Sequence, residues 1–480
     1  MKRKLSQGIL LLFVLALGFC ACKSEDQPPD TTQPSLSEET GAEVLQDLLP
    51  TIDMGNREFV MITEPTWNEY NYFYADEYNG DPINDTAYRR TMYVENRFQF
   101  VMKYTELAGV LQALRNSDMA GGGDYDLVYP HPNDGTAALL TEGLLANLRE
   151  LPNLHLEREW YSQQQVTDYE VNGNLMLVVS DYSIIGQGIA GLLCNADRYA
   201  ALGYTDDLYD VVYSGEWTIE RMTEIVKDTA SVNEGAGDKI DYGLVFRSNS
   251  ACNIFSHALG ENILVRNADG EFELGFTASS MTAVAEALYE LLYETNGNVL
   301  FGEGTDAMFP TSEMWTTYRQ GSSLFITYDF GVFTRYLREL EFEVCYLPYP
   351  TLEGGADYRV VCGSGFFAIP AKAENTEESA VVLESLSIYS YEYMRPEFFN
   401  TILLGRLSEN QNDYEMLEYL HNNKFYDFGV TFDETGVAKN LLYRVLFSYN
   451  DVRAVTTYMR GHAGELQEVV DSANALWENN

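Results

Sequence analysis

The chain has 480 residues, which is too long for one compact domain, and its 46% hydrophobic and 13% aromatic content excludes global disorder. Its 73 acidic and 30 basic side chains give a formal net charge of −43. A field of that sign repels nucleic-acid backbones, and it disfavours anionic ligands unless the chain builds a local basic pocket.

The N-terminus has the pattern of an export signal. A basic stretch at residues 2–4 precedes an unbroken apolar run over residues 9–19, which is too short to span a bilayer and is typical of a signal-peptide core. The small residue Ala21 precedes Cys22, which predicts a lipoprotein signal peptide over residues 1–21 and lipidation, palmitate included, at Cys22. Phe19 departs from the leucine that this pattern usually has. An ordinary cleaved signal with incidental cysteines is the alternative.

Residues 22–50 continue as a polar, acidic and Pro-rich segment with too little apolar surface to form a core. Such a segment predicts a flexible linker between the lipidated cysteine and a folded body. We therefore expect the protein to be lipid-anchored at the extracellular face of the cell membrane, or at the periplasmic face if the cell has an outer membrane.

Four further cysteines lie in the body of the chain: Cys194, Cys252, Cys345 and Cys362. They form no CxxC pair, so their spacing does not favour a zinc site. Cys345 and Cys362 sit in two apolar, strand-like runs. Either they pair as a disulfide, which an exported protein allows, or they are buried free thiols.

Residues 56–145 alternate between segments with the hydrophobic pattern of a strand and segments with that of a helix. This alternation predicts a doubly wound α/β domain. The expected strands cover residues 56–63, 100–104 and 126–129, and the expected helices cover 84–98, 107–115 and 137–145.

The later segments continue as strands and helices. We expect strands at 171–179 and 192–194, helices at 196–202 and 219–229, and a mostly helical stretch over 412–477. Thr218 is a suitable N-cap for the helix 219–229. Trp217 and Trp160 are expected to be structural.

Short patterns in the same order as in a known family run over residues 56–400. They are 124–128 (DYDLV), 143–148 (GLLANL), 172–175 (NGNL), 216–218 (EWT), 241–244 (DYGL), 321–325 (GSSLF) and 347–350 (LPYP). Together they resemble the extracellular solute-binding proteins (family 1, sugar type) of ABC importers. Residues 327–330 depart from the family's Gly-rich turn, and the tail after Tyr391 is long.

The resemblance implies an α/β, two-lobed fold of the periplasmic-binding-protein (Venus flytrap) type. Each lobe would be a sheet flanked by helices, and crossing hinge strands would join them. The N-terminal lobe would comprise 51–182 and 353–405, and the C-terminal lobe 183–352 and 406–480. The implied protein is a monomer without catalysis, cofactor or metal that captures a mono- or oligosaccharide and delivers it to the transmembrane subunits of a permease.

In open α/β sheets, ligands sit beyond the carboxyl ends of the strands, so we expect the site there. Aromatic rings stack on the C–H face of a sugar, and carboxylates accept hydrogen bonds from its hydroxyls. The candidate ligand-binding residues are Glu64, Trp67, Tyr129, Asp181, Tyr182, Tyr328, Asp329, Phe330 and Ser364.

Two other functions stay open. An extracellular solute sensor would share every one of these features. A carbohydrate-active enzyme would need two carboxylates facing each other across the cleft. Aromatic rings beside carboxylates would also suit a quaternary amine, as a minor alternative.

Overall fold

The computed structural model describes residues 45–65, 71–132, 135–186, 188–232, 242–296, 298–302, 312–329, 337, 340–355, 357–403 and 411–479. The predicted signal peptide and Cys22 lie outside these residues, as do Trp67 and Phe330.

The first sheet has three parallel strands in the order β2-β1-β3. β1 (Arg57–Thr63) lies between β2 (Phe100–Glu106) and β3 (Leu127–Tyr129). The crossover helices are α2 (Pro82–Phe98) and α3 (Val110–Ala120). The predicted βαβαβ unit is therefore confirmed, although α3 begins later than expected, after Gly109, whose φ is +80°.

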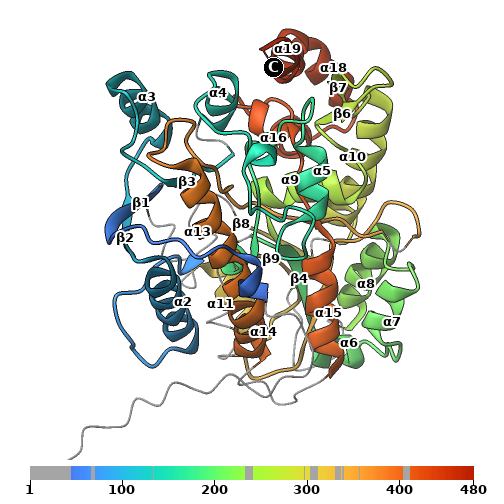
Figure 1. Ribbon diagram of the computed structural model, residues 1–480. Coiled ribbons are helices and arrows are strands. Elements are labelled where there is room, and N and C mark those ends of the chain that lie inside the picture. The colour runs from blue at the N-terminus through green and yellow to red at the C-terminus, as the bar shows by residue number, and fades with distance from the viewer. Residues whose placement is uncertain are drawn as a thin grey trace, which may run out of the picture. The chain divides into compact units, whose positions relative to one another are not determined.

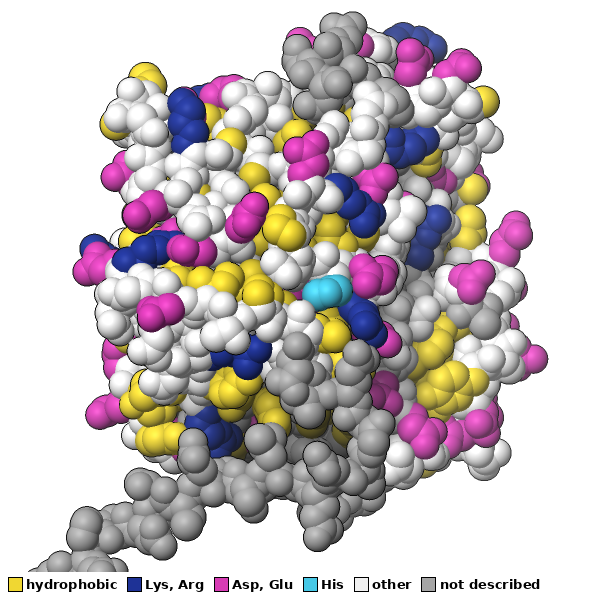
Figure 2. Space-filling view, in the orientation of Figure 1, with side chains coloured by type: hydrophobic (Ala, Val, Ile, Leu, Met, Phe, Trp, Pro, Cys, Tyr) yellow, Lys and Arg dark blue, Asp and Glu magenta, His cyan; other side chains and the backbone are white. Residues whose placement is uncertain are grey.

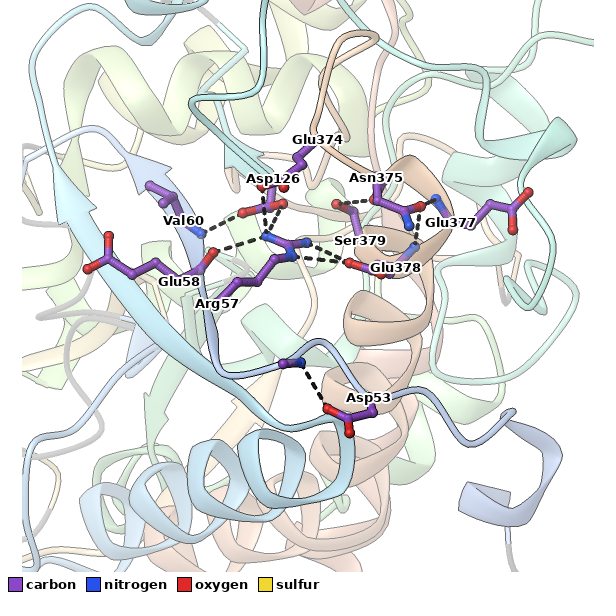
Figure 3. Close-up of polar contacts among 11 residues, drawn as sticks. Asp53, Arg57, Glu58, Val60, Asp126, Glu374, Asn375, Glu377, Glu378 and Ser379 are labelled. Carbon is purple, nitrogen blue, oxygen red and sulfur yellow. Dashed lines mark hydrogen bonds and ion pairs between the residues drawn. The ribbon is translucent and has the colours of Figure 1, made fainter.

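An ion-pair cluster joins this sheet to helix α13 (Thr376–Tyr389), as Figure 3 shows. Arg57 lies 2.9 Å from the Asp126 carboxylate and 3.0 Å from that of Glu378. Asp126 also accepts the backbone N–H of Val60 at 2.8 Å. Three segments far apart in the sequence are thus held together at one end of β1.

Later segments return to the first sheet through isolated bridges, which pair Val128 with Ala368 and Val178 with Phe367. The prediction of one continuous strand over 171–179 is wrong. Asn172 and Gly173 have φ of +53° and +78°, so the chain turns there and an extended run cannot pass through.

The second sheet has five strands in the order β10-β4-β9-β5-β8. They are β4 (Ala190–Asn195), β5 (Tyr242–Arg247), β8 (Val299–Gly302), β9 (Ser323–Asp329) and β10 (Val344–Leu347). β4 is antiparallel to both its neighbours, whereas β5, β8 and β9 are mutually parallel.

Helices flank both sheets, with α2 and α13 beside the first sheet and α8 (Ile219–Val232) beside the second, while α10 (Ala278–Tyr293) packs on α8 (Figure 1). The Arg221 N–H donates to Thr218 Oγ1 at 3.2 Å, which confirms the predicted cap of α8. Trp217 and Trp160 are both buried, as expected for structural residues, and Trp217 Nε1 donates to the Pro348 carbonyl at 2.9 Å.

Three short segments of chain, at 188–190, 360–363 and 424–426, run side by side between the two sheets. They are called the passages below. β11 (Val360–Val361) pairs in parallel with β12 (Lys424–Phe425), and Ile189 forms a bridge with Cys362. Gly188 has φ +58°, and a Cβ atom there would stand 3.1 Å from the backbone nitrogen of Gly363. A side chain at this position would be strained and would crowd the Gly363 backbone, which favours glycine here.

The remaining helices and strands surround the two sheets and form the C-terminal tail. They are η1 (Leu45–Leu48), α4 (Thr136–Thr141), η2 (Leu148–Glu150), α5 (Gln163–Asp168), η3 (Asp181–Gly186), α6 (Ala196–Ala201), α7 (Leu208–Tyr213), α9 (Ser248–Ala258), β6 (Leu264–Arg266), β7 (Phe272–Leu274), α11 (Glu313–Arg319), η6 (Ser390–Met394), α14 (Arg395–Leu403), α15 (Gln411–Asn422), α16 (Gly429–Phe432), α17 (Leu441–Tyr443), η7 (Arg444–Tyr449), α18 (Ala454–Gly461) and α19 (Ala463–Asn479). The mostly helical tail is confirmed.

Cys194, Cys252, Cys345 and Cys362 form no disulfide, so Cys345 and Cys362 do not have the disulfide that was one of the two alternatives. The other alternative expected both thiols to be buried, whereas both are half-buried. Cys345 lies opposite Cys194 in the β10–β4 ladder. Within the residues that the structure describes, no helix combines the length and the apolar composition needed to cross a membrane.

Candidate functional site

A pocket of about 720 Å³ opens beyond the carboxyl ends of β3, β5 and β9. His131 and Pro132 follow β3, Arg247 ends β5, and Thr327 lies near the end of β9. Parallel strands end at a common edge, so loops that are distant in sequence meet there.

Other walls come from the three passages between the sheets and from the tail. The passages contribute Gly188, Ala190, Val361, Cys362, Gly363 and Ser364. The tail contributes Tyr426, Asp427, Val430, Lys439, Asn440 and Tyr443. Because both sheets and the passages between them line one pocket, any shift of one sheet against the other would change its shape.

Aromatic rings make up much of the lining: Tyr169, Trp315, Tyr349, Phe366, Tyr426 and Tyr443. Several are held by other rings behind them. Tyr349 packs edge-on against Phe255 with ring centroids 4.7 Å apart, and Tyr443 stacks on Phe447 at 5.2 Å. Tyr443 is half-buried and can offer a flat apolar face at little entropic cost, whereas the other five rings are buried.

Helix α9 supplies a row of polar groups. It begins at the pocket edge and places Ser248, Asn249, Ser250, Asn253 and His257 in the lining. The Nδ1 atom of His257 lies 2.9 Å from the Glu261 carbonyl oxygen. A carbonyl can only accept, so Nδ1 carries a proton, and in the neutral ring Nε2 is an acceptor.

Burial, together with the nearby Lys439 charge, lowers the pKa of His131 to about 4. This ring is therefore neutral at pH 7 and can both donate and accept a hydrogen bond. The pocket thus combines flat rings, neutral donors and acceptors, and a few charged groups.

Of the residues predicted as ligand contacts, Ser364 lines the pocket. Its side chain is buried, and Oγ donates to the Gly365 carbonyl at 3.0 Å. Tyr328 and Asp329 follow the lining residue Thr327 on β9, and the structure describes their backbone only. Trp67 and Phe330 fall outside the described residues.

Four predicted contacts lie elsewhere, and none belongs to the described lining. Glu64 accepts the N–H groups of Gly109 and Val110 at 3.2 and 3.0 Å, at the start of α3. Tyr129 and Tyr182 pack in the core against Phe367, with ring centroids 4.8 and 5.0 Å away.

The fourth of these residues, Asp181, is buried 3.4 Å from His421 Nε2 and 3.7 Å from Arg395. The ligand-binding roles of all four residues stay predictions.

Sequence reasoning missed Arg247, Trp315 and Lys439. The apolar run 243–246 is followed by the polar run 247–250 (RSNS), so the same strand-end rule would have indicated Arg247 and the start of α9. No comparable signal marks Lys439, because the tail reaches the pocket only through tertiary packing.

Within the described ranges, no group of three or more His, Cys, Asp or Glu side chains is placed to hold a metal ion.

No protein-family model matches the sequence, and a comparison with curated proteins finds no match either. Solved structures do match. UgpB from Mycobacterium tuberculosis, in complex with glycerophosphocholine, superposes with a TM-score of 0.56 at 16% identity, covering 87% of this chain and 98% of that one.

Two further structures match over a similar span. Lmo0181 of Listeria monocytogenes, an ABC substrate-binding protein in complex with cycloalternan, gives a TM-score of 0.52 at 12% identity, covering 88% of this chain and 99% of that one. The GacH receptor of Streptomyces glaucescens gives 0.53 at 11% identity, covering 86% and 99%. The chain therefore has the two-lobed α/β fold of the extracellular solute-binding proteins, as its sequence predicts.

Proposed function

We propose that this protein is the solute-binding component of an ABC importer, which captures a mono- or oligosaccharide in the pocket and delivers it to the transmembrane subunits of a permease. The observation that carries the proposal is the lining itself: aromatic rings and neutral hydrogen-bonding groups gathered at the carboxyl ends of strands, between two sheets. Solved structures of similar fold include complexes with cycloalternan, raffinose and maltose.

The lining suits the surface of a sugar. A pyranose ring has an apolar C–H face, which packs on a tyrosine or tryptophan ring, and a rim of hydroxyls that need both donors and acceptors. Asn253 and His257 supply such groups from α9. The volume of about 720 Å³ lies within the range of small-molecule sites.

The proposed mechanism is closure of two lobes on the ligand. We place the N-terminal lobe at 51–182 and 353–405 and the C-terminal lobe at 183–352 and 406–480. The passages at 188–190, 360–363 and 424–426 would form the hinge. A ligand that touches both lobes binds the closed form more tightly and so raises its population, which the permease recognises.

We further propose that the protein works as a lipid-anchored monomer at the outer face of the membrane, attached through Cys22 after removal of residues 1–21. The basic start, the apolar run and Ala21 support this. Mass spectrometry of the mature N-terminus tests it, because an acylated Cys22 adds the mass of its acyl chains.

A thermal-shift screen of residues 23–480 against mono- and oligosaccharides, amino acids and peptides tests the proposed ligand class. A ligand that binds only the folded state raises the thermal midpoint by mass action, so a sugar should raise it and the other classes should not. A clear shift with amino acids or peptides and none with any sugar would refute carbohydrate capture.

The same samples test the alternative of hydrolysis. Glycoside hydrolysis generally uses two carboxyl groups, and Asp427 is the one carboxylate among the described lining residues. We therefore expect oligosaccharides to be recovered intact after incubation with the protein. Release of shorter sugars would favour an enzyme.

A further inference from the structure

Helix α9 presents a row of polar side chains to the pocket. Ser250, Asn253 and His257 lie at intervals of three and four residues, so they share one face of the helix, and all three line the pocket. Acidic and basic side chains are scattered over the face in Figure 2, whereas this row consists of a hydroxyl, an amide and an imidazole. The row therefore offers hydrogen bonds along the length of α9.

One end of the row is a buried acceptor without a donor. His257 is 2% exposed, and its Nε2 atom has no hydrogen-bond partner among the described residues. Because the Nδ1–H group donates to the Glu261 carbonyl at 2.9 Å, Nε2 of the neutral ring can only accept. A buried polar atom without a partner is costly, so we expect a ligand to supply a donor here.

A second polar group without a partner lies one helical turn away, at Asn253. The side chain is half-buried, and its Oδ1 atom is buried with no hydrogen-bond partner in the part of the chain that the structure describes. An amide that is turned over would present an N–H donor at the same place. A sugar hydroxyl can donate and accept, so it satisfies either orientation, whereas an ionised carboxylate can only accept.

The row is longer than one sugar ring. Ser250 and His257 are seven positions apart, which at the helical rise corresponds to about 10 Å along the axis of α9. One pyranose ring does not extend so far, whereas two linked rings do. The pocket volume of about 720 Å³ also lies in the upper part of the range for small-molecule sites, which is about 300–1,000 Å³.

An aromatic ring lies beside the row. Tyr443 belongs to α17, which packs against α9, and its half-buried ring lines the pocket. Phe447 stacks on this ring with centroids 5.2 Å apart and so supports it from the protein side. A sugar unit can therefore place its C–H face on Tyr443 and turn its hydroxyl edge toward α9.

We propose that the ligand is an oligosaccharide of two or more sugar units that lies along α9. Asn253 and His257 select it, because its hydroxyls donate to their buried acceptors. Ser250 binds a hydroxyl at the other, less buried end of the row, and Tyr443 packs on a ring face. This inference rests on the proposed function and narrows its ligand class from mono- or oligosaccharides to oligosaccharides.

Isothermal titration of the 23–480 protein with maltose, cellobiose, lactose and raffinose, each against its constituent monosaccharides, tests the length of the ligand. We expect at least one oligosaccharide to bind about 10-fold or more tightly than its monosaccharides, because its second unit adds hydrogen bonds along α9.

The two ways of failing are distinct. Monosaccharides that bind as tightly as the oligosaccharides containing them would overturn this inference and leave carbohydrate capture intact. Failure of every sugar to bind would overturn the proposed function as well.

Two variants of His257 test its acceptor with the tightest-binding oligosaccharide. His257→Asn can keep an N–H group near the position of Nδ1 but removes the acceptor at Nε2, so it should weaken binding about 5-fold or more. His257→Gln places an amide near the position of Nε2 and should lose less affinity. Unchanged affinity in His257→Asn would mean that water, and not the ligand, satisfies Nε2, which would overturn the role of His257.

Variants at the less buried positions keep the inference testable if the His257 variants do not fold. Asn253→Leu should weaken the oligosaccharide about 5-fold, and Asn253→Asp, which keeps an acceptor, should lose less. Ser250→Ala has a matched control in Ser256→Ala: both serines are half-buried on α9, and Ser256 is not among the described lining residues. Unchanged affinity in Asn253→Leu and Ser250→Ala, or an equal loss in Ser256→Ala, would overturn the inference.

Discussion

The backbone N–H of Arg247 donates to the side-chain oxygen of Thr327 at 3.0 Å, which ties the end of β5 to β9 in the pocket wall. Thr327 is nearly buried, and its hydroxyl lies 3.4 Å from the Val245 carbonyl, to which it can donate. One hydroxyl thus joins two strands where Arg247 leaves the sheet and α9 begins.

Thr327→Val should lower the free energy of unfolding by about 1–3 kcal/mol, because it leaves the partly buried Arg247 N–H without its acceptor. Thr327→Ser keeps the hydroxyl and should cost less. Urea denaturation of both variants measures the difference. A loss for Thr327→Ser as large as the loss for Thr327→Val would contradict a specific stabilising role of the hydroxyl.

Gly188→Ala should destabilise the protein more than Gly173→Ala. Both positions have positive φ, at +58° and +78°, so an alanine at either is strained by about 1–2 kcal/mol. Only at Gly188 would the new Cβ stand 3.1 Å from the Gly363 backbone, whereas nothing lies within 4 Å at Gly173. Thermal unfolding of the pair checks this, and similar midpoints would show that the passages separate freely.

Arg57→Met should lower the free energy of unfolding by about 2–3 kcal/mol, because it leaves the Asp126 carboxylate buried without its cation. Asp126 is 5% exposed at its side chain. Lys103→Met is the control: its partner Glu58 is 64% exposed, and such pairs contribute about 0–1 kcal/mol. Equal effects of the two substitutions would contradict the structural role of the cluster in Figure 3.

Acid should destabilise the fold partly through His421. Burial, with the adjacent Lys424 charge, lowers the pKa of His421 from 6.5 to about 3, and Lys424 Nζ lies 3.2 Å from its Nε2 atom. Between these values the unfolded chain binds a proton that the folded chain does not. The free energy of unfolding therefore decreases as pH falls below about 6.5.

The His421→Gln variant isolates this contribution. It should lose less stability than the original protein between pH 7 and pH 4, measured by chemical denaturation at several pH values. Parallel pH profiles would show that His421 titrates normally in the folded state.

The fold could largely be predicted because its elements carry local signals. The strands at 57–63 and 100–106 contain the short apolar runs 59–62 and 100–102, and Thr218 marks the start of α8 in the sequence itself. The prediction of one strand over 171–179 failed because the apolar composition of these residues suits a strand, whereas Asn172 and Gly173 turn the chain. A turn inside an apolar run depends on backbone conformation, which composition does not report.

The site could be predicted only in part. The rule that ligands bind beyond the carboxyl ends of strands led to Ser364, which does line the pocket. It does not say which side chain in a loop points outward, and Tyr129 packs inward on Phe73 with ring centroids 4.8 Å apart. Lys439 and Tyr443 come from a helical tail whose path depends on long-range packing.

A crystal structure of the protein with the sugar that most raises its thermal midpoint tests the central claim most directly. The account predicts the sugar in the pocket beyond β3, β5 and β9, with a ring face against Trp315 or Tyr443 and its polar groups at α9. A sugar bound at another surface, or the lack of any sugar that binds, would contradict carbohydrate capture at this site.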